Sequence, residues 1–395
     1  MKTATKHTIF VGLSIVGTVS IYLFRADFSI GFTDSSNLAD STINSTATSQ
    51  VSANNKWSKV YNGLERDRPL RIIGMNDVLL RNSIFENIKG NDAIAIVNSD
   101  NVYIDNVVVD RLGGKNNLSG IRIHNSTNVT IANSVISKIS SPRHSAGIKI
   151  TGSKSANITI ANNHIHETYG NGIISGGCSD CAATQTVHDT PVPRLKITNN
   201  LIHDTGKTPT PVRSSPTHGM YVKAQDAYIM GNTIYNIFDG QGISIRSTAV
   251  VLNNKVWDTR LAAIGFLQMK PPGNSMTSVV KNNELFFTKN KPPSLGAKSL
   301  LFLNWSKKSS YPLRYENFIV RNNKLAICTS NVEDLPLIKL YPFANLTIDR
   351  NKLIDRRQNQ HFFDYLGTID IDYEKRGHNT FSSSGCNTFN PKKST

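Results

Sequence analysis

Short stretches in which apolar residues alternate with other residues recur along most of the chain. Four begin with glycine: Gly120-Ile-Arg-Ile-His124, Gly147-Ile-Lys-Ile-Thr151, Gly219-Met-Tyr-Val-Lys223 and Gly242-Ile-Ser-Ile-Arg246. The looser stretches Leu300–Asn304 and Leu337–Tyr341 continue the pattern. A period of two is typical of a β-strand that buries one face. No helix-length apolar period separates the stretches, so the pattern predicts short strands joined by turns and excludes a helical solenoid.

A second string lies between the first ones and ends in asparagine followed, two residues later, by Ile, Val or Leu. Ten asparagines align in this way: Asn82, Asn106, Asn133, Asn163, Asn200, Asn232, Asn254, Asn283, Asn323 and Asn351. They are 22 to 40 residues apart. A repeated asparagine at one turn position can bond the equivalent asparagine of the next repeat, and asparagine also tolerates turn conformations. We therefore predict an asparagine ladder that runs through stacked repeats.

Repeats of this length that contain only short strands predict a single-stranded right-handed parallel β-helix of about ten or more coils. Its coils would stack at ~4.8 Å. A propeller or sandwich fits less well, because the chain lacks hairpin signals such as Asn-Gly between paired strands. The fold class is therefore all-β, and the β-helix domain is expected to occupy residues 59–395.

The N-terminus has the features of an export segment. Lys2 and Lys6 precede an uncharged, mostly apolar run of 17 residues from Thr8 to Phe24, and Arg25 closes it. Residues 1–30 are therefore expected to be a signal peptide or an uncleaved signal anchor that partners the membrane. Residues 31–58, rich in Ser, Thr and Asn, are expected to form a flexible linker. We expect an extracytoplasmic protein, periplasmic or secreted, with anchoring to the inner membrane as the alternative to cleavage.

The Asn-Asn ladder and the Gly-Ile-x-Ile strands make residues 60–390 similar to the pectate-lyase-like superfamily of right-handed parallel β-helix proteins. The resemblance is closest to bacterial β-helix repeat proteins that process polysaccharides. Members of the superfamily include pectate lyases, polygalacturonases, alginate lyases, mannuronan epimerases and phage tailspikes. The resemblance implies the fold and an acidic polysaccharide as partner, but it does not specify the reaction.

The charge of the chain agrees with such a partner. It contains 44 Lys and Arg residues against 28 Asp and Glu residues, a formal net charge of +16. Such an excess attracts polyanions. Export favours an acidic polysaccharide over nucleic acid, and we expect a monomer.

The strand pattern also predicts which side chains point outward. If the alternate aliphatic residues point inward, two outward columns form along the stack. The first contains Arg122, Lys149, Ile174, Tyr221, Ser244, Gly265, Phe302 and Lys339. The second contains His124, Thr151, Gly176, Lys223, Arg246, Leu267, Asn304 and Tyr341. Neither column contains a carboxylate.

This absence favours one chemistry over another. Glycoside hydrolysis normally needs two carboxyl groups at the scissile bond. Cleavage next to a uronate by β-elimination instead needs a cation for the sugar carboxylate and a base for the C5 proton. The columns supply Arg, Lys, His and Tyr, so we predict a polysaccharide lyase that acts on a uronate-containing polymer, with exopolysaccharide processing as its expected role.

The densest group of such residues defines the candidate site. The predicted catalytic residues are His218, Tyr221, Lys223 and Arg246, and the predicted substrate-binding residues are Arg122, His124 and Lys149. Arg246 or Lys223 would neutralise the carboxylate, and Tyr221 or His218 would take the proton. The insertions at residues 175–194 and 206–216 would wall the site. For His218 a purely structural role at a turn is an equal alternative, and the whole face is alternatively a solvated basic surface.

Other functions share this scaffold. A C5-epimerase begins with the same proton abstraction. A glycoside hydrolase would need carboxylates elsewhere, and Asp370 and Asp372, two residues apart on one predicted strand, would be ~7 Å from each other. A non-catalytic glycan-binding envelope protein would bind acidic polymers and leave them unchanged.

The four cysteines are expected to form disulfides in an oxidising compartment, Cys178 with Cys181 and Cys328 with Cys386. A zinc site at Cys178 and Cys181 is the alternative, but the chain has no second ligand pair at zinc-finger spacing. No cofactor is expected; the alternative is Ca²⁺ held by aspartates from different coils, namely Asp180, Asp189, Asp204 and Asp226.

One further column follows the asparagine ladder: His166, His203, Tyr235, Trp257 and Phe286. Aromatic rings bind sugars, so these residues are a candidate glycan track. Plain stacking of side chains along a flank of the β-helix is the favoured interpretation.

Overall fold

The computed structural model describes residues 56–114, 117–141, 145–176, 192–207, 217–246, 248–267, 277–288, 299–304, 317–329, 336–340, 346–357, 363–365 and 378–386. The expected export segment and nearly all of the expected linker lie outside these ranges. Within them, no helix has the length and apolar character of a membrane span. Contacts between residues divide the chain after Ala53, and the unit described below is the second one, residues 54–395.

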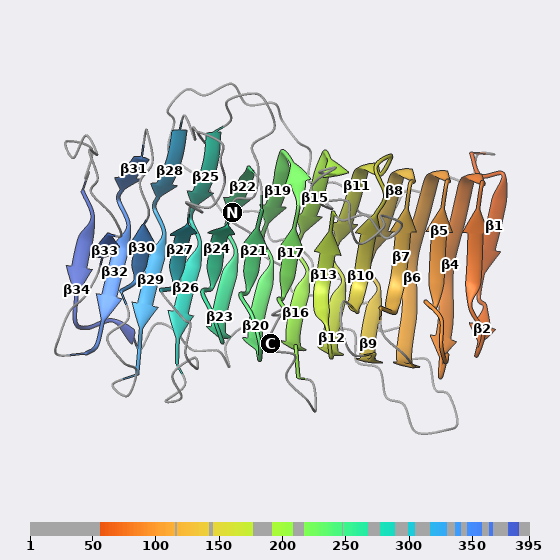
Figure 1. Ribbon diagram of the computed structural model, residues 1–395, viewed down its shortest axis with the longest axis horizontal. Coiled ribbons are helices and arrows are strands. Elements are labelled where there is room, and N and C mark those ends of the chain that lie inside the picture. The colour runs from red at the N-terminus through yellow and green to blue at the C-terminus, as the bar shows by residue number, and fades with distance from the viewer. Residues whose placement is uncertain are drawn as a thin grey trace, which may run out of the picture. The chain divides into compact units, whose positions relative to one another are not determined.

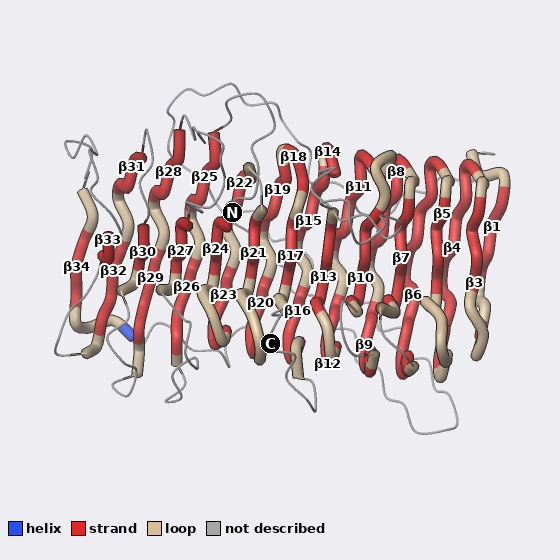
Figure 2. Tube along the Cα trace, viewed as in Figure 1, coloured by secondary structure: helices blue, strands red, loops and turns tan. Residues whose placement is uncertain are grey.

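The described residues form stacked coils of parallel strands, as the sequence predicts (Figure 1). A typical coil contains β7 (Ser119–His124), β8 (Thr127–Ala132) and β9 (Val135–Ser140). Each strand pairs in parallel with the equivalent strand one coil away; Lys149, for example, is in register with Arg122. Figure 2 shows strands and turns almost throughout. The expected all-β, single-stranded parallel β-helix is confirmed.

One sheet has eleven strands, and each strand comes from a different coil. They are β3 (Leu70–Ile73), β5 (Ile94–Val97), β7, β10 (Ala146–Thr151), β13 (Asn171–Ser175), β17 (Met220–Val222), β21 (Ile243–Ile245), β24 (Ile264–Leu267), β27 (Leu301–Asn304), β30 (Ile338–Leu340) and β33 (Phe363–Tyr365).

A second sheet of 21 strands consists of two parallel ladders joined by two long strands, β4 (Asn76–Glu86) and β6 (Asp100–Gly113), which run through both. The first ladder contains β1 (Lys59–Asn62), β8, β11 (Ala156–Ala161), β15 (Leu195–Thr198), β19 (Ala227–Met230), β22 (Ala249–Leu252), β25 (Thr277–Lys281), β28 (Asn317–Arg321) and β31 (Leu346–Asp349). The second contains β2 (Glu65–Arg66), β9, β12 (His164–Thr168), β16 (Leu201–Thr205), β20 (Thr233–Ile237), β23 (Lys255–Thr259), β26 (Glu284–Phe287), β29 (Lys324–Ile327), β32 (Lys352–Asp355) and β34 (Thr380–Ser382). A small extra pair joins β14 (Val192–Pro193) to β18 (Ala224–Gln225).

The alternating aliphatic residues fill the interior. Ile121, Ile148, Ile173 and Met220 stand in register on adjacent strands and are completely buried. Burial of such columns removes apolar surface from water along the whole stack, and this is the main stabilising contribution to the fold.

Five of the eleven strands are opened by a glycine, which is needed because neighbouring atoms leave no room for a side chain. A Cβ atom on Gly147 would lie 2.5 Å from the Cγ2 of Ile165 and 2.8 Å from the carbonyl oxygen of Gly172 in the next coil. Gly120, Gly172, Gly219 and Gly242 are equally crowded. Glycine therefore lets the eleven-stranded sheet approach the aliphatic residues of the neighbouring ladder.

The asparagine ladder is present from Asn163 to Asn379. Asn163 Oδ1 accepts the main-chain N–H of Ser134. From Asn200 onward, the side-chain oxygen of each asparagine accepts two hydrogen bonds from the asparagine one coil earlier. At Asn254, for example, the main-chain N–H and the side-chain Nδ2 donate to Oδ1 of Asn283 at 2.9 and 3.0 Å. These amides are buried, so the mutual hydrogen bonds satisfy groups that water does not reach.

The predicted ladder is wrong by one residue in the first three coils. Asn82, Asn106 and Asn133 are exposed and adopt positive φ angles of 50 to 52°. The buried ladder position belongs there to the following residue, Ser83, Val107 or Ser134, and Ser134 Oγ accepts the N–H of Val107. The misalignment arose because asparagine is common at both positions: later coils carry one asparagine in the left-handed turn and a second in the ladder.

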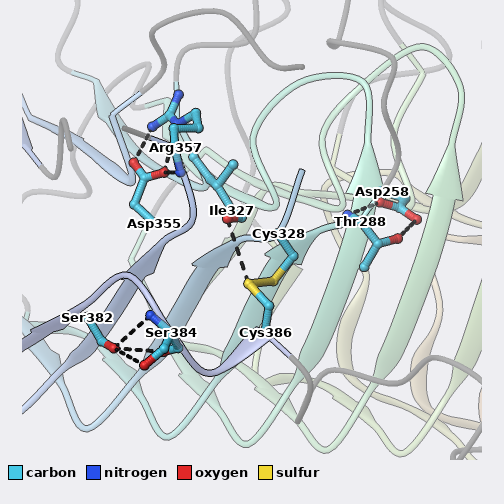
Figure 3. The surroundings of a disulfide bond; sticks show 9 residues. All are labelled: Asp258, Thr288, Ile327, Cys328, Asp355, Arg357, Ser382, Ser384 and Cys386. Atoms are coloured by element: carbon cyan, nitrogen blue, oxygen red, sulfur yellow. Dashed lines mark hydrogen bonds and ion pairs between the residues drawn. A yellow bond between two sulfur atoms is a disulfide. The ribbon is translucent and has the colours of Figure 1, made fainter. Parts of the chain in front are cut away.

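The C-terminal part of the described chain is tied to the stack by a disulfide. Cys386 bonds to Cys328, which follows β29, with 5.5 Å between the Cα atoms (Figure 3). This is the pairing that the sequence predicts. Nearby, the buried Arg357 donates from Nε to Oδ1 of Asp355 at 2.8 Å. Cys178 and Cys181 lie outside the described residues.

Candidate functional site

The outward columns occur in the predicted register. Arg122, Lys149, Ile174, Tyr221, Ser244, Gly265, Phe302 and Lys339 are aligned across the eleven-stranded sheet. In the second column His124 is aligned with Thr151 and Leu267 with Asn304. We call the outward side of β7, β10, β13, β17, β21 and β24 the outer face. It displays two groups of polar residues.

The first group, the tyrosine cluster, contains all four predicted catalytic residues. Tyr221 is at its centre. The Arg246 guanidinium carbon is 4.9 Å from the centroid of the Tyr221 ring, and the Lys223 Nζ is 5.9 Å from it. The ring of His218 is 5.5 Å from the same centroid. Adjacent coils thus bring together residues that the sequence separates by as many as 28 positions.

Arg246 is the most buried charge of the tyrosine cluster. Burial lowers its pKa, and the charge and hydrogen bond of the Tyr221 side chain oppose that shift. Its Nη1 donates to the carbonyl oxygen of Leu267 at 3.4 Å. Its Nε is buried and has no hydrogen-bond partner within the described part of the chain. A buried guanidinium with an unused N–H is suited to bind an anion that enters the site.

His218 is built into the turn that precedes β17. Its Nδ1 accepts the main-chain N–H of Gln241 at 2.9 Å, and its own N–H donates to Oδ1 of Asn171 at 2.8 Å. Burial, followed by the charge of Arg246, lowers the pKa of His218 to about 3. The ring is therefore neutral at ordinary pH with its Nδ1 lone pair occupied. This geometry agrees with the structural alternative for His218 and leaves Tyr221 as the better base.

The second group, the cation cluster, begins two coils before Tyr221 and contains Lys149, Arg122 one coil further away and Asp92 one coil beyond that. Arg122 Nη1 lies 3.9 Å from Oδ2 of Asp92, and Oδ1 of Asp92 accepts the N–H of Ser119 at 2.7 Å. Lys149 donates from Nζ to the side-chain oxygen of Asn117. Lys149 is aligned with Ile174, and Ile174 with Tyr221, so ~10 Å along the stack separates the two groups.

The cation cluster perturbs the ionisation of its own members. Burial, and then the charge of Arg122, lowers the pKa of Lys149 to about 8, while Asp92 opposes this shift. Burial raises the pKa of Asp92, against the Ser119 hydrogen bond and the neighbouring cations. Two cations share one carboxylate, so the cluster has an excess of positive charge that suits a ligand carboxylate.

His124 contributes less to the outer face than the sequence suggests. It is only 9% exposed. Its Nδ1 lies 3.0 Å from Thr151 Oγ1 and its Nε2 3.1 Å from Asn125 Nδ2. Both ring nitrogens are thus occupied by neighbouring side chains, which leaves Arg122 and Lys149 as the better ligands for a substrate.

Sequence reasoning missed Asp92, although a signal was present. Asp92 stands immediately before Ala93-Ile-Ala-Ile96, a repeat that lacks its glycine, and it occupies the same turn position as Ser119, Asn171, His218 and Gln241. Asp92, Asn171 and His218 each accept the main-chain N–H of the equivalent residue in the next coil. The residue that precedes the first residue of each repeated string is therefore polar in most of these coils, and this is the signal for the column.

The column that follows the asparagine ladder is a continuous stack of rings. The rings of His203 and Tyr235 are 4.7 Å apart and inclined by 7°, and those of Tyr235 and Trp257 are 4.5 Å apart and inclined by 14°. Phe286 continues the stack. Because neighbouring rings cover both faces, only ring edges are left for a sugar. The geometry therefore supports stacking rather than a glycan track.

The remaining metal-ligand candidates do not converge on one site in the described part of the chain. Among the described residues, no group of three or more His, Cys, Asp or Glu side chains is placed to hold a metal ion. Asp204, on β16 beside His203, and Asp226, which precedes β19, belong to different coils. Asp180, Asp189, Asp370 and Asp372, together with most of the two predicted wall insertions, lie outside the described part of the chain.

Comparison with known proteins supports the fold. Residues 28–188 match the family described as "Right handed beta helix region". The tailspike protein gp49 from Pseudomonas phage LKA1 is 13% identical with a TM-score of 0.50, over 79% of this chain and 48% of that chain. This chain is a right-handed parallel β-helix protein.

Two further β-helix structures are similar at lower scores. The A-module of the mannuronan C-5 epimerase AlgE4 from Azotobacter vinelandii is 12% identical, with a TM-score of 0.45, over 83% of this β-helix chain and 91% of that chain. A DFA-IIIase from Arthrobacter chlorophenolicus A6 is 10% identical, with a TM-score of 0.47, over 84% and 86%. No curated protein sequence matches the chain.

Proposed function

We propose that this chain is an extracytoplasmic polysaccharide lyase that cleaves a uronate-containing polymer by β-elimination. The observation that carries the proposal is the pairing of Tyr221 with Arg246. A hydroxyl able to exchange a proton lies against a buried guanidinium whose Nε has no hydrogen-bond partner. Proton transfer and neutralisation of a carboxylate are the two tasks of the reaction.

In the proposed reaction Tyr221, as the phenolate, takes the C5 proton of the bound uronate. The electrons of the C5–H bond form a C4–C5 double bond, and the bond from C4 to the glycosidic oxygen breaks. The departing oxygen takes a proton, which the Tyr221 hydroxyl can supply. Arg246 holds the uronate carboxylate and stabilises the charge that develops there. Lys223 adds a second cation close to the same ring.

The cation cluster would anchor another carboxylate of the polymer. Arg122 and Lys149 lie on the same outward column as Tyr221, so a chain laid along the stack would pass both groups. The single carboxylate of this cluster, Asp92, is engaged by Ser119 and Arg122. A glycosidase needs two carboxyl groups at the bond, and the described side chains of the outer face provide no pair.

The location and the fold fit this proposal. A disulfide between Cys328 and Cys386 suits an oxidising compartment such as the periplasm or the exterior. The right-handed β-helix also occurs in proteins named for polysaccharide chemistry, including a mannuronan C-5 epimerase.

The test is incubation of the purified protein with a panel of uronate polymers, followed by ultraviolet absorbance of unsaturated uronate ends. Tyr221→Phe should lower turnover by roughly 10²- to 10⁴-fold, because a positioned acid–base group contributes about that much. Arg246→Ala should lower it by about 10²- to 10³-fold. Tyr228→Phe, which changes a tyrosine on β19 of the other sheet, is the matched control and should retain full turnover.

Other outcomes would replace the proposal. Inverted uronate residues without chain cleavage would identify an epimerase. New reducing ends without unsaturation, abolished by Asp92→Asn or Asp370→Asn, would identify a hydrolase. Binding of acidic polymers with no change in any of them would leave a glycan-binding protein.

A further inference from the structure

Beyond Tyr221, away from the cation cluster, the outer face changes character. Ser244 is aligned with Tyr221 one coil on, and Gly265 is aligned with Ser244. The side chain of Gln241 lies over Gly265, because a Cβ atom there would be 1.9 Å from Gln241 Nε2. A glycine is thus required for the Gln241 amide to extend along the face beside Ser244.

Both side chains contain polar atoms that are buried without a partner. Gln241 is 2% exposed and Ser244 is fully buried. Among the described residues, the Oε1 atom of Gln241 and the Oγ atom of Ser244 have no hydrogen-bond partner. Buried polar atoms are almost always paired in folded proteins, and an unpaired one lowers stability. Two unpaired atoms next to the proposed base therefore indicate that a ligand completes them.

The chemistry of these atoms restricts that ligand. The Gln241 Oε1 atom can only accept a hydrogen bond. An ionised carboxylate also only accepts, so the two cannot bond each other. A sugar hydroxyl donates, so it pairs with Oε1 and can in turn accept from Ser244. Neutral sugars and uronates both carry such hydroxyls, so the charge around the two atoms decides between them.

Charge favours a neutral sugar. Arg246, which follows Ser244 on the same coil, is assigned to the uronate at Tyr221. The column of Ser244 then continues through Gly265 and Phe302, and its next charged residue is Lys339.

We propose that Gln241 and Ser244 form a subsite for a neutral, hydroxyl-bearing sugar, so that the substrate is a heteropolymer of uronate and neutral sugars rather than a polyuronate. This inference rests on the proposed function and names its substrate class. The cation cluster binds a carboxylate on one side of Tyr221, and the amide and hydroxyl bind an uncharged sugar on the other.

The experiment measures binding separately from turnover. In the Tyr221→Phe background, titration calorimetry compares two oligosaccharides of equal length: one of uronates only, and one in which the uronates alternate with neutral sugars. The alternating oligosaccharide should bind more tightly. Gln241→Leu and Ser244→Ala should each weaken its binding by roughly tenfold, the usual worth of one hydrogen bond, and leave the all-uronate ligand unaffected.

Thr205→Val is the matched control, because Thr205 also contains a buried hydroxyl without a partner but lies on β16 in the other sheet. It should change the binding of neither oligosaccharide. Equal weakening of both ligands by Gln241→Leu, no weakening of either, or tighter binding of the all-uronate ligand would overturn the subsite. Selective weakening without turnover of any polymer by the unmodified protein would overturn the lyase and leave the subsite standing.

Discussion

Lys149 is a cation in an environment that disfavours its charge. Burial and the nearby Arg122 lower its pKa to about 8 in the free protein. The protonated form predominates below that pH and is the form that attracts a substrate carboxylate. A residue that is only partly ionised near neutrality thus links substrate capture to pH.

We predict that kcat/KM on the best acidic polymer falls as the pH rises through about 8, because this ratio reports ionisations of the free enzyme. Lys149→Met should lower kcat/KM at pH 7 and abolish the break. Lys149→Arg should restore the charge and move the break upward. A break at about pH 8 that persists in Lys149→Met would assign the ionisation to another group.

The histidines at the end of the aromatic stack should make the fold sensitive to acid. His164 Nε2 lies 2.7 Å from His203 Nε2, a hydrogen bond that requires one ring to be an unprotonated acceptor. Burial, then the charges of His166 and His203, lowers the pKa of His164 from 6.5 to about 4. The unfolded chain therefore binds more protons between these values, and stability is lost as the pH falls from about 6.5 towards 4.

Thermal unfolding measured between pH 7 and pH 4 should show this loss, and His164→Gln should reduce it. His378→Gln, which changes an exposed histidine, should leave the pH dependence as it is. An unchanged acid response in His164→Gln would show that this cluster does not control it.

At the residue scale, the outward columns could be predicted because strand alternation alone determines them. Tyr221 and Arg246 were found in this way. Asp92 and Gln241 were not, since they stand in the turn before the strand, where alternation no longer applies. Whether a buried polar atom finds a hydrogen-bond partner depends on residues one coil away, and a local sequence pattern does not reveal these neighbours.

At the scale of one element, we predict that adding one methyl group at a glycine that opens a strand of the eleven-stranded sheet destabilises the fold. Gly147→Ala places Cβ against Ile165 and the main chain of Gly172. Overpacking of this kind costs about 1–3 kcal/mol of unfolding free energy. Gly113→Ala is the control, because its Cβ would meet only the Ser140 hydroxyl at 3.2 Å. Chemical denaturation should separate the two variants; equal losses would contradict the steric explanation.

The same scale shows why one ladder was misread. The strand pattern predicted the type of each element and the alignment of the eleven-stranded sheet. It did not distinguish Asn82 from Ser83, because an asparagine in a left-handed turn and one in a buried ladder look alike in the sequence. Only the pairing of Val107 with Ser134 resolves the register.

At the scale of the whole molecule, the disulfide should hold the C-terminal part of the stack. Cys386 packs with Cys328 beside the apolar cluster of Trp257, Phe286 and Ile354. The bond spans 58 residues, and closure of a loop of that size stabilises by about 2–4 kcal/mol. The double variant Cys328→Ser, Cys386→Ser should therefore lose hydrogen-exchange protection in β32 and β34 while β7 and β10 remain protected. Equal loss in β7 and β10 would show that the stack unfolds as one unit.

The asparagine ladder also gives the solenoid a direction. From Asn163 to Asn351, each side-chain oxygen accepts from the coil before it. Each side-chain Nδ2 donates both to the asparagine oxygen of the coil after it and to a main-chain oxygen of the coil before it. A chain interrupted between two coils, during synthesis or after proteolysis, would therefore expose, at its newest end, asparagine N–H groups that lack the next asparagine oxygen. At an opposite cut it would expose an asparagine oxygen that lacks these donors. Two such ends match head to tail and not head to head. Unfinished chains that associate through this ladder should thus form polar filaments, in which the next coil is borrowed from another molecule.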